Sequence, residues 1–205
     1  MKFTVDSVMG LAPVIPVLVI EDVAHAVPIA QALVAGGLPA LEVTLRTPCA
    51  LDVIRAMKTV SGAVVGAGTV LNPRDLDAAL DAGAEFIVSP GLTQALGEAA
   101  VASGKPFLPG IANAGDLMRG LDLGLSRFKF FPAMANGGIP ALSALASAFG
   151  GIRFCPTGGI TLANAPDWLA LGPVACVGGS WVVPKGAPDV AVIEAAAHAA
   201  AALKR

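Results

Sequence analysis

The chain has 205 residues, 55% of them hydrophobic, and a formal net charge of −2, which suits a single domain with one large core. Because it carries no long run of Lys or Arg, it lacks the basic surface of a nucleic-acid binder, and small molecules are the expected ligands. No apolar stretch reaches the ~18 residues that span a bilayer, so we expect no membrane partner and a cytoplasmic location.

The first apolar stretch, 11–20, resembles the core of a secretory signal peptide, because an Ala-His-Ala sequence follows it like a cleavage site. Asp6 places an acidic residue where such a peptide is basic, and Pro13 and Pro16 interrupt the apolar run. We therefore predict a short N-terminal helix, followed by a first buried strand at 14–20.

Along the rest of the chain, short apolar runs alternate with Ala- and Leu-rich segments of helical period, a pattern typical of βα units in a parallel sheet. Strands are predicted at 14–20, 40–45, 63–70, 86–90, 106–110, 127–132, 152–159 and 174–180. The clearest helices are predicted at 22–36, 72–82, 93–103, 114–123, 139–149 and 190–203. Asp22 and Asn72 are the expected N-cap residues of two of them.

Eight strands alternating with helices predict an α/β fold of the TIM (β/α)8 barrel type, formed by one domain over residues 1–205. A doubly wound open sheet is the alternative, but residues 21–24 after the first strand contain no G-x-G-x-x-G turn. In a barrel, functional residues lie at the C-terminal ends of the strands. The polar residues and turn residues at those ends are therefore the candidates for a site, and they include Thr69, Ser89 and Pro90.

The second strand carries charged residues on one face. Period-two alternation places Glu42, Thr44 and Arg46 together, opposite Val43 and Leu45. The apolar pair is expected to pack on helices, which aims the charged residues inward. A structural ion pair between Glu42 and Arg46 is the alternative, but four residues along a strand span roughly 13 Å, so separate roles are favoured.

The sixth strand contains the sequence FKFFPA, in which a lysine stands among three aromatic rings. Alternation places Lys129 and Phe131 on the inner face and aims Phe128 and Phe130 at the helices. A Lys129 that points outward and snorkels between helices is the alternative. Inside, desolvation and the neighbouring Arg46 would favour the neutral amine, which can attack a ketone to form a Schiff base.

Glycines close the last two strands, at Gly158-Gly159 and at Gly178-Gly179-Ser180. Many TIM barrels bind phosphate there through backbone N–H groups. One glycine pair alone would mark only a tight turn, whereas two at consecutive strands favour a phosphate site. With an inward lysine, they predict a phosphorylated substrate whose carbonyl lies at the centre.

The metal-binding residue types are sparse. Cys49, Cys155 and Cys176 form neither a CxxC pair nor a disulfide framework, which predicts a reducing compartment. His25 and His198 lie far apart in helix-like stretches, so an imidazole-ligated metal is not expected. We expect no metal and no cofactor.

Six segments carry a family resemblance: LEVTLRT (41–47), VVGAGTVLN (64–72), FIVSPG (86–91), FKFFPA (128–133), CPTGGI (155–160) and VGGSW (177–181). In order and spacing they resemble bacterial 2-keto-3-deoxy-6-phosphogluconate aldolases and the closely related 4-hydroxy-2-oxoglutarate aldolases. The resemblance runs from about Pro13 to Trp181. It implies a class I, metal-independent aldolase on a TIM barrel, assembled as a homotrimer.

The resemblance also implies residue roles. Lys129 would form the Schiff base, Glu42 would be the general acid/base, and Arg46 and Thr69 would hold the pyruvoyl carboxylate. The other implied substrate contacts are Pro90 and Phe131, which would wall the pyruvoyl pocket, and Thr157.

Gly158, Gly159, Gly179 and Ser180 would bind phosphate by the same resemblance. One departure is Met134, where the family commonly has Glu. Since Met134 lies past the strand end, the departure bears on aldehyde-side specificity rather than on the reaction.

The implied reaction cleaves 2-keto-3-deoxy-6-phosphogluconate to pyruvate and glyceraldehyde 3-phosphate, with 4-hydroxy-2-oxoglutarate as a second substrate. A phosphate-binding barrel isomerase of sugar or amino-acid metabolism is the alternative, because it would share the glycine motifs and could use Glu42 as its base. A catalytically silent binding protein on the same scaffold is a third possibility. Neither alternative needs an inward Lys129, so the aldolase is favoured.

Overall fold

The computed structural model describes residues 3–184 and 186–204 of the chain. Its strands are β1 (Val14–Leu18), β2 (Ala40–Thr44), β3 (Val64–Gly68), β4 (Phe86–Val88), β5 (Phe107–Leu108), β6 (Gly110–Ile111), β7 (Arg127–Phe130), β8 (Arg153–Pro156) and β9 (Val177–Gly179). They pair in parallel in two sheets, one of six strands in the order β5-β4-β3-β2-β1-β9 and one of three in the order β6-β7-β8.

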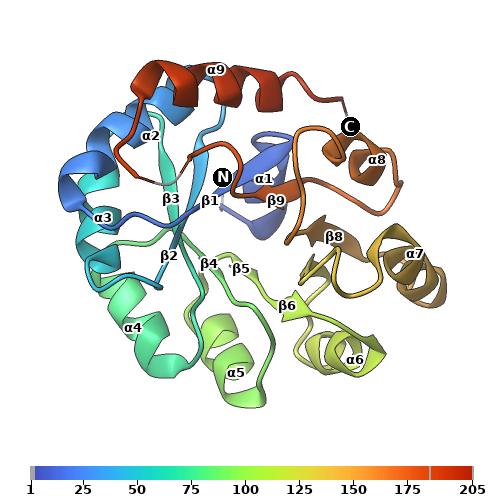
Figure 1. The fold of residues 1–205 in the computed structure, drawn as a ribbon. Coiled ribbons are helices and arrows are strands. Elements are labelled where there is room, and N and C mark those ends of the chain that lie inside the picture. Colours follow the sequence, from blue (N-terminus) through green and yellow to red (C-terminus); the bar gives the residue numbers. More distant parts are fainter. Residues whose placement is uncertain (1–2, 185, 205) are drawn as a thin grey trace.

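Helices surround these strands (Figure 1). They are α1 (Val5–Gly10), α2 (Ala26–Ala35), α3 (Ala50–Met57), α4 (Pro73–Asp81), α5 (Gln94–Ala102), α6 (Ala114–Asp122), α7 (Gly138–Ala148), α8 (Ala165–Leu169) and α9 (Val190–Ala201), with a 3-10 turn η1 (Val23–His25) before α2. The predicted N-caps are confirmed, since Asp22 accepts a hydrogen bond from Ala24 N–H at 2.9 Å and Asn72 accepts one from Asp75 N–H at 3.0 Å.

The predicted closed eight-stranded TIM barrel is wrong, because the strands form two open sheets instead of one continuous ring. The predicted strand 106–110 divides at Pro109, which has no N–H to donate, so β5 pairs with β4 and β6 pairs with β7. Among the described residues, β8 meets the segment of β9 through isolated bridges, one of which joins Thr157 to Gly178. Pro156 also lacks an N–H at this junction.

Apolar side chains pack on both sides of the strands. The larger cluster lies between strands and helices, and includes Phe128 and Phe130 as predicted. The ring of Phe130 lies 6.4 Å from that of Trp168 on α8, centroid to centroid. The smaller cluster contains Val8 and Met9 of α1 together with inward residues of the strands. Helix α1, the expected short N-terminal helix, therefore covers one end of the space that the strands surround (Figure 1).

Within the described part of the chain, no helix is both long enough and apolar enough to cross a membrane. Cys49 and Cys155 carry free thiols, the first half-buried and the second buried. The strand ends opposite α1 carry most of the residues that the sequence singles out.

Candidate active site

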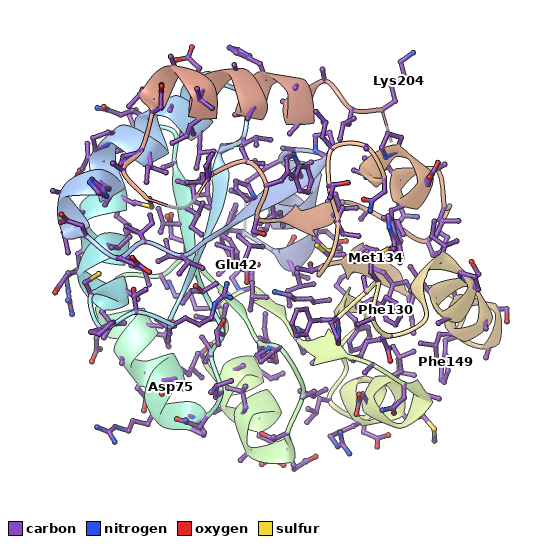
Figure 2. The ribbon with its side chains drawn as sticks, in the orientation of Figure 1. Glu42, Asp75, Phe130, Met134, Phe149 and Lys204 are labelled. Atoms are coloured by element: carbon purple, nitrogen blue, oxygen red, sulfur yellow. The ribbon has the colours of Figure 1, made fainter. Side chains whose placement is uncertain are left out.

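A buried ion pair joins β2 to β7. The Nζ of Lys129 donates a hydrogen bond of 2.9 Å to Oε1 of Glu42, and the two side chains are only 6% and 3% exposed. Glu42 lies near the centre of the molecule (Figure 2). Lys129 therefore points inward as predicted, and the alternative of a lysine that snorkels between helices is wrong.

The backbone fixes both partners. On β2, Glu42 stands between Val17 of β1 and Gly66 of β3. On β7, Lys129 stands between Gly110 of β6 and Cys155 of β8, and its N–H donates to the Pro109 carbonyl at 2.8 Å. These strand pairings fix the positions of the two Cα atoms, from which the side chains of Glu42 and Lys129 reach one another.

Gly68 makes room for the carboxylate, a role that sequence reasoning missed. A Cβ at Gly68 would lie 2.3 Å from Oε1 of Glu42, so any larger residue would displace the acid. The available signal was the small-residue run in β3, where side chains leave space beside the predicted inward Glu42.

A cavity of about 170 Å³, here called the site cavity, opens at the strand ends beside this pair. Its lining consists of Val17, Arg46, Phe131, Thr157, Gly158, Gly159, Ile160, Gly178, Gly179 and Ser180. The ring of Phe131 connects the cavity to the ion pair, because its centroid lies 5.5 Å from Nζ of Lys129. A larger cavity of about 470 Å³ lies between α1 and α8, away from the candidate residues, and includes Asp6 and Arg153 in its lining.

Arg46 lies in the turn after β2, past the strand alternation that predicted an inward position. Its side chain is exposed, yet it reaches the site cavity. No described residue forms an ion pair with Arg46, so the alternative of a structural Glu42–Arg46 pair is wrong. A guanidinium that has no protein carboxylate as a partner is suited to bind an anionic group of a ligand.

Each of the four glycines that line the site cavity stands where a larger residue would be strained or would clash, for different reasons. Gly158 and Gly159 have φ of 103° and 77°, a region that other residues rarely adopt. A Cβ on Gly178 would lie 2.2 Å from Oγ1 of Thr157, and one on Gly179 would overlap the ring of Trp181. The glycines therefore bring two backbone segments close together, and this close approach leaves backbone at the cavity wall.

The remaining predicted residues lie around this centre. Thr157 is buried in the cavity wall, and its hydroxyl donates to the Cys155 carbonyl at 3.3 Å. Thr69 is half-buried with φ of 59°, and Pro90 is half-buried with its backbone against Gly110. Neither Thr69 nor Pro90 is among the lining residues of the site cavity.

Met134 follows the end of β7, and its side chain is exposed (Figure 2). Its N–H donates to the Gly158 carbonyl at 3.0 Å, and its side chain lies against Gly159. The apolar side chain therefore covers one side of the turn formed by residues 157–160, here called the glycine turn. In the described residues, no group of three or more His, Cys, Asp or Glu side chains is arranged to hold a metal ion.

Comparisons of the sequence with known proteins all indicate the same enzyme family. Residues 5–196 match the family model for KDPG and KHG aldolases, where KDPG is 2-keto-3-deoxy-6-phosphogluconate and KHG is 4-hydroxy-2-oxoglutarate. A 2-dehydro-3-deoxy-phosphogluconate aldolase of Zymomonas mobilis is 66% identical over 201 residues, which cover 98% of this chain and 97% of that protein.

Solved structures give the same result. The crystal structure of the 2-keto-3-deoxy-6-phosphogluconate aldolase of Zymomonas mobilis ZM4 with 3-phosphoglycerate matches at a TM-score of 0.98 and 65% identity, covering 100% of this chain and 98% of that one. A KDPG aldolase from Legionella pneumophila, crystallised with pyruvate captured at low pH as a covalent carbinolamine intermediate, matches at 0.95 and 44% identity over 98% and 100% of the two chains.

Proposed function

The chain belongs to the KDPG and KHG aldolase family, and we propose that it cleaves KDPG to pyruvate and glyceraldehyde 3-phosphate through a Schiff base on Lys129. The observation that carries the proposal is the contact of 2.9 Å between Nζ of Lys129 and a carboxylate oxygen of Glu42, in a buried position beside the site cavity. An isomerase would not need this amine as a covalent electron sink. An aldolase needs both an amine and a proton carrier within reach of it.

The first half of the reaction builds an electron sink. Glu42 takes a proton from the Lys129 ammonium through their hydrogen bond, which leaves a neutral amine. The amine attacks the C2 ketone to give a carbinolamine, and Glu42 returns a proton to the departing hydroxyl, so that water leaves and an iminium remains. The ring of Phe131 limits the access of water to this position.

The second half cleaves the C3–C4 bond and releases the two products. Glu42, now a carboxylate, takes the proton of the C4 hydroxyl while the C3–C4 bond breaks. The electron pair of the breaking bond moves into the iminium and forms an enamine. Glyceraldehyde 3-phosphate leaves as the aldehyde. Protonation of C3 and addition of water to the restored iminium release pyruvate and Lys129, so the water lost in the first half is returned.

The two ends of the substrate need separate anchors. We assign the carboxylate to Arg46, which lines the cavity and forms no ion pair with a described residue, together with Thr69. We assign the phosphate to backbone N–H groups of residues that line the same cavity, namely Gly158, Gly159, Gly179 and Ser180. Pro90, Phe131 and Thr157 would then enclose the pyruvoyl unit between the anchors.

We propose two further properties on the family likeness. The protein would assemble as a homotrimer, which light scattering coupled to size-exclusion chromatography can test. It would act in the cytoplasm, where Cys49 and Cys155 would stay reduced.

The experiment that tests the proposed function is a coupled assay of pyruvate release from KDPG and from KHG. We expect turnover of both, with a lower KM for KDPG, and loss of turnover in Lys129→Ala. If the wild-type protein releases no pyruvate from either acid, or if the alanine variant keeps its turnover, the proposal fails.

A further inference from the structure

The glycine turn 157–160 is held by the side chain of Asn164, which does not line the site cavity. We infer that Asn164 is a positioning residue for the phosphate: its side-chain amide holds the peptide group between Gly159 and Ile160 with the carbonyl away from the site cavity and the N–H toward it. This inference rests on the proposed function, because it concerns the phosphate end of the same substrate.

The carbonyl oxygens of the first three residues of the turn accept hydrogen bonds from groups that do not line the cavity. The Thr157 carbonyl accepts from Ala133 N–H at 2.8 Å, and the Gly158 carbonyl accepts from Met134 N–H at 3.0 Å. The Gly159 carbonyl accepts from Nδ2 of Asn164 at 3.1 Å. A carbonyl oxygen would repel a phosphate oxygen, so turning these three oxygens away removes the repulsion.

The same bonds direct N–H groups of the turn. In a planar trans peptide, the C=O of one residue and the N–H of the next point in opposite directions. Carbonyls that are held away from the cavity at 158 and 159 therefore turn the N–H groups of Gly159 and Ile160 toward it. The parallel bridge between Thr157 and Gly178 places the Gly158 N–H against the backbone of β9. No described residue accepts a hydrogen bond from the N–H groups of Gly159 and Ile160, and both residues line the site cavity. Two neighbouring free donors at the cavity wall are suited to bind an anion.

Asn164 is the side chain in this arrangement that a substitution can remove. It occupies the N-cap position of α8, where an Asn side chain usually accepts from the helix N–H groups, but it makes no capping bond. Its Oδ1 accepts from Thr161 N–H at 2.8 Å, while Nδ2 donates to Gly159. The side chain therefore stabilises the turn in place of the helix that follows it.

Thr161 offers a matched control in the same loop. Its hydroxyl accepts from the Asn164 N–H at 3.3 Å and forms no hydrogen bond with the Gly159 carbonyl. Thr161→Val removes that bond and leaves the Asn164 side chain in place. Asn164→Ala removes the donor to Gly159, and Asn164→Asp replaces the donor with an acceptor while keeping the bond to Thr161.

The test compares KM and kcat for phosphorylated KDPG and for KHG, which has no phosphate. We expect Asn164→Ala and Asn164→Asp to raise KM for KDPG about fivefold to tenfold, as the loss of one orienting hydrogen bond would do. The inhibition constant of inorganic phosphate should rise in the same proportion. The kcat for both substrates, KM for KHG and the yield of the pyruvate adduct should stay within about twofold, and Thr161→Val should match the wild type.

Three results would overturn the inference: an equal rise of KM for both substrates, an unchanged KM for KDPG in both Asn164 variants, or the same rise in Thr161→Val. These outcomes are distinct from a failure of the proposed function, in which the wild-type protein itself releases no pyruvate. Thermal unfolding of each variant identifies any general loss of stability.

Discussion

Nζ of Lys129 and Oε1 of Glu42 lie 2.9 Å apart, although the two residues are 87 positions apart in sequence and belong to different sheets. A buried ion pair of this kind contributes little net stability, but removing one partner leaves an uncompensated charge and costs about 3–5 kcal/mol. Variants at either position must therefore be compared with changes that keep the fold.

Lys129→Arg separates chemistry from folding. Arginine keeps a cation beside Glu42, but a guanidinium stays protonated and cannot attack a ketone. We expect pyruvate with borohydride to give the wild-type protein one stable adduct on the FKFFPA peptide, and to give Lys129→Arg none. Turnover of the variant should be undetectable. An adduct on another lysine of the wild-type protein, found by peptide mass mapping, would contradict the assignment.

Glu42→Gln should separate amine attack from proton transfer. The amide keeps the shape and can accept from the amine, but it cannot carry a proton, so kcat should fall about 10²–10⁴-fold. The pyruvate adduct should still form with borohydride, at a lower rate. Exchange of the pyruvate methyl protons with D2O should fall in parallel with kcat. A variant that loses the adduct entirely, or keeps more than a tenth of kcat, would assign Glu42 a different role.

Strand alternation predicted the inward direction of Glu42 and Lys129 because each lies in a short strand with apolar residues opposite. It did not predict their contact, because β2 and β7 are not neighbours and their relative height depends on every strand between them. Arg46 was placed by an alternation that ends at Thr44.

Closure of the sheet was predicted from the number of strands, and here the sequence pattern was misleading. Alternation of strands and helices does not report whether each pair of neighbours exchanges hydrogen bonds. Pro109 and Pro156 stand at the two junctions where the strand pairing stops or weakens. In the sequence each lies within a segment that reads as one continuous strand, so the break in pairing could not be predicted. The hydrogen bond from Asn164 to Gly159 could not be predicted from the sequence either, because Asn before a helix indicates an ordinary N-cap.

Gly68→Ala should impair catalysis through Glu42. The new Cβ would lie 2.3 Å from Oε1, so the carboxylate has to move away from Lys129. We expect kcat to fall at least about tenfold, and stability to fall by about 1–3 kcal/mol from overpacking. Gly150→Ala is the matched control, since a Cβ there meets no atom within 4 Å. If Gly68→Ala keeps full activity in the pyruvate assay, the carboxylate position is less restricted than the contact implies.

Metal removal should have no effect on turnover. In the proposed reaction the iminium on Lys129 withdraws electrons from the breaking bond, which is the task of a metal ion in the other class of aldolases. We expect protein dialysed exhaustively against EDTA to keep its full kcat for KDPG. Loss of activity that a divalent ion restores would place the electron sink on a metal.

Arg46 and the glycine turn line the same cavity, so the assignment of Arg46 to the carboxylate needs its own test. Every substrate and product that forms the Schiff base carries the carboxylate, whereas only KDPG carries phosphate. Arg46→Gln should therefore raise KM for KDPG and KHG alike, about 10–100-fold for the loss of a charged hydrogen bond. The pyruvate concentration for half-maximal trapping by borohydride should rise by the same factor. Arg74→Gln, at an exposed arginine of α4, is the matched control and should behave as wild type. A rise confined to KDPG, with unchanged pyruvate trapping, would move Arg46 to the phosphate.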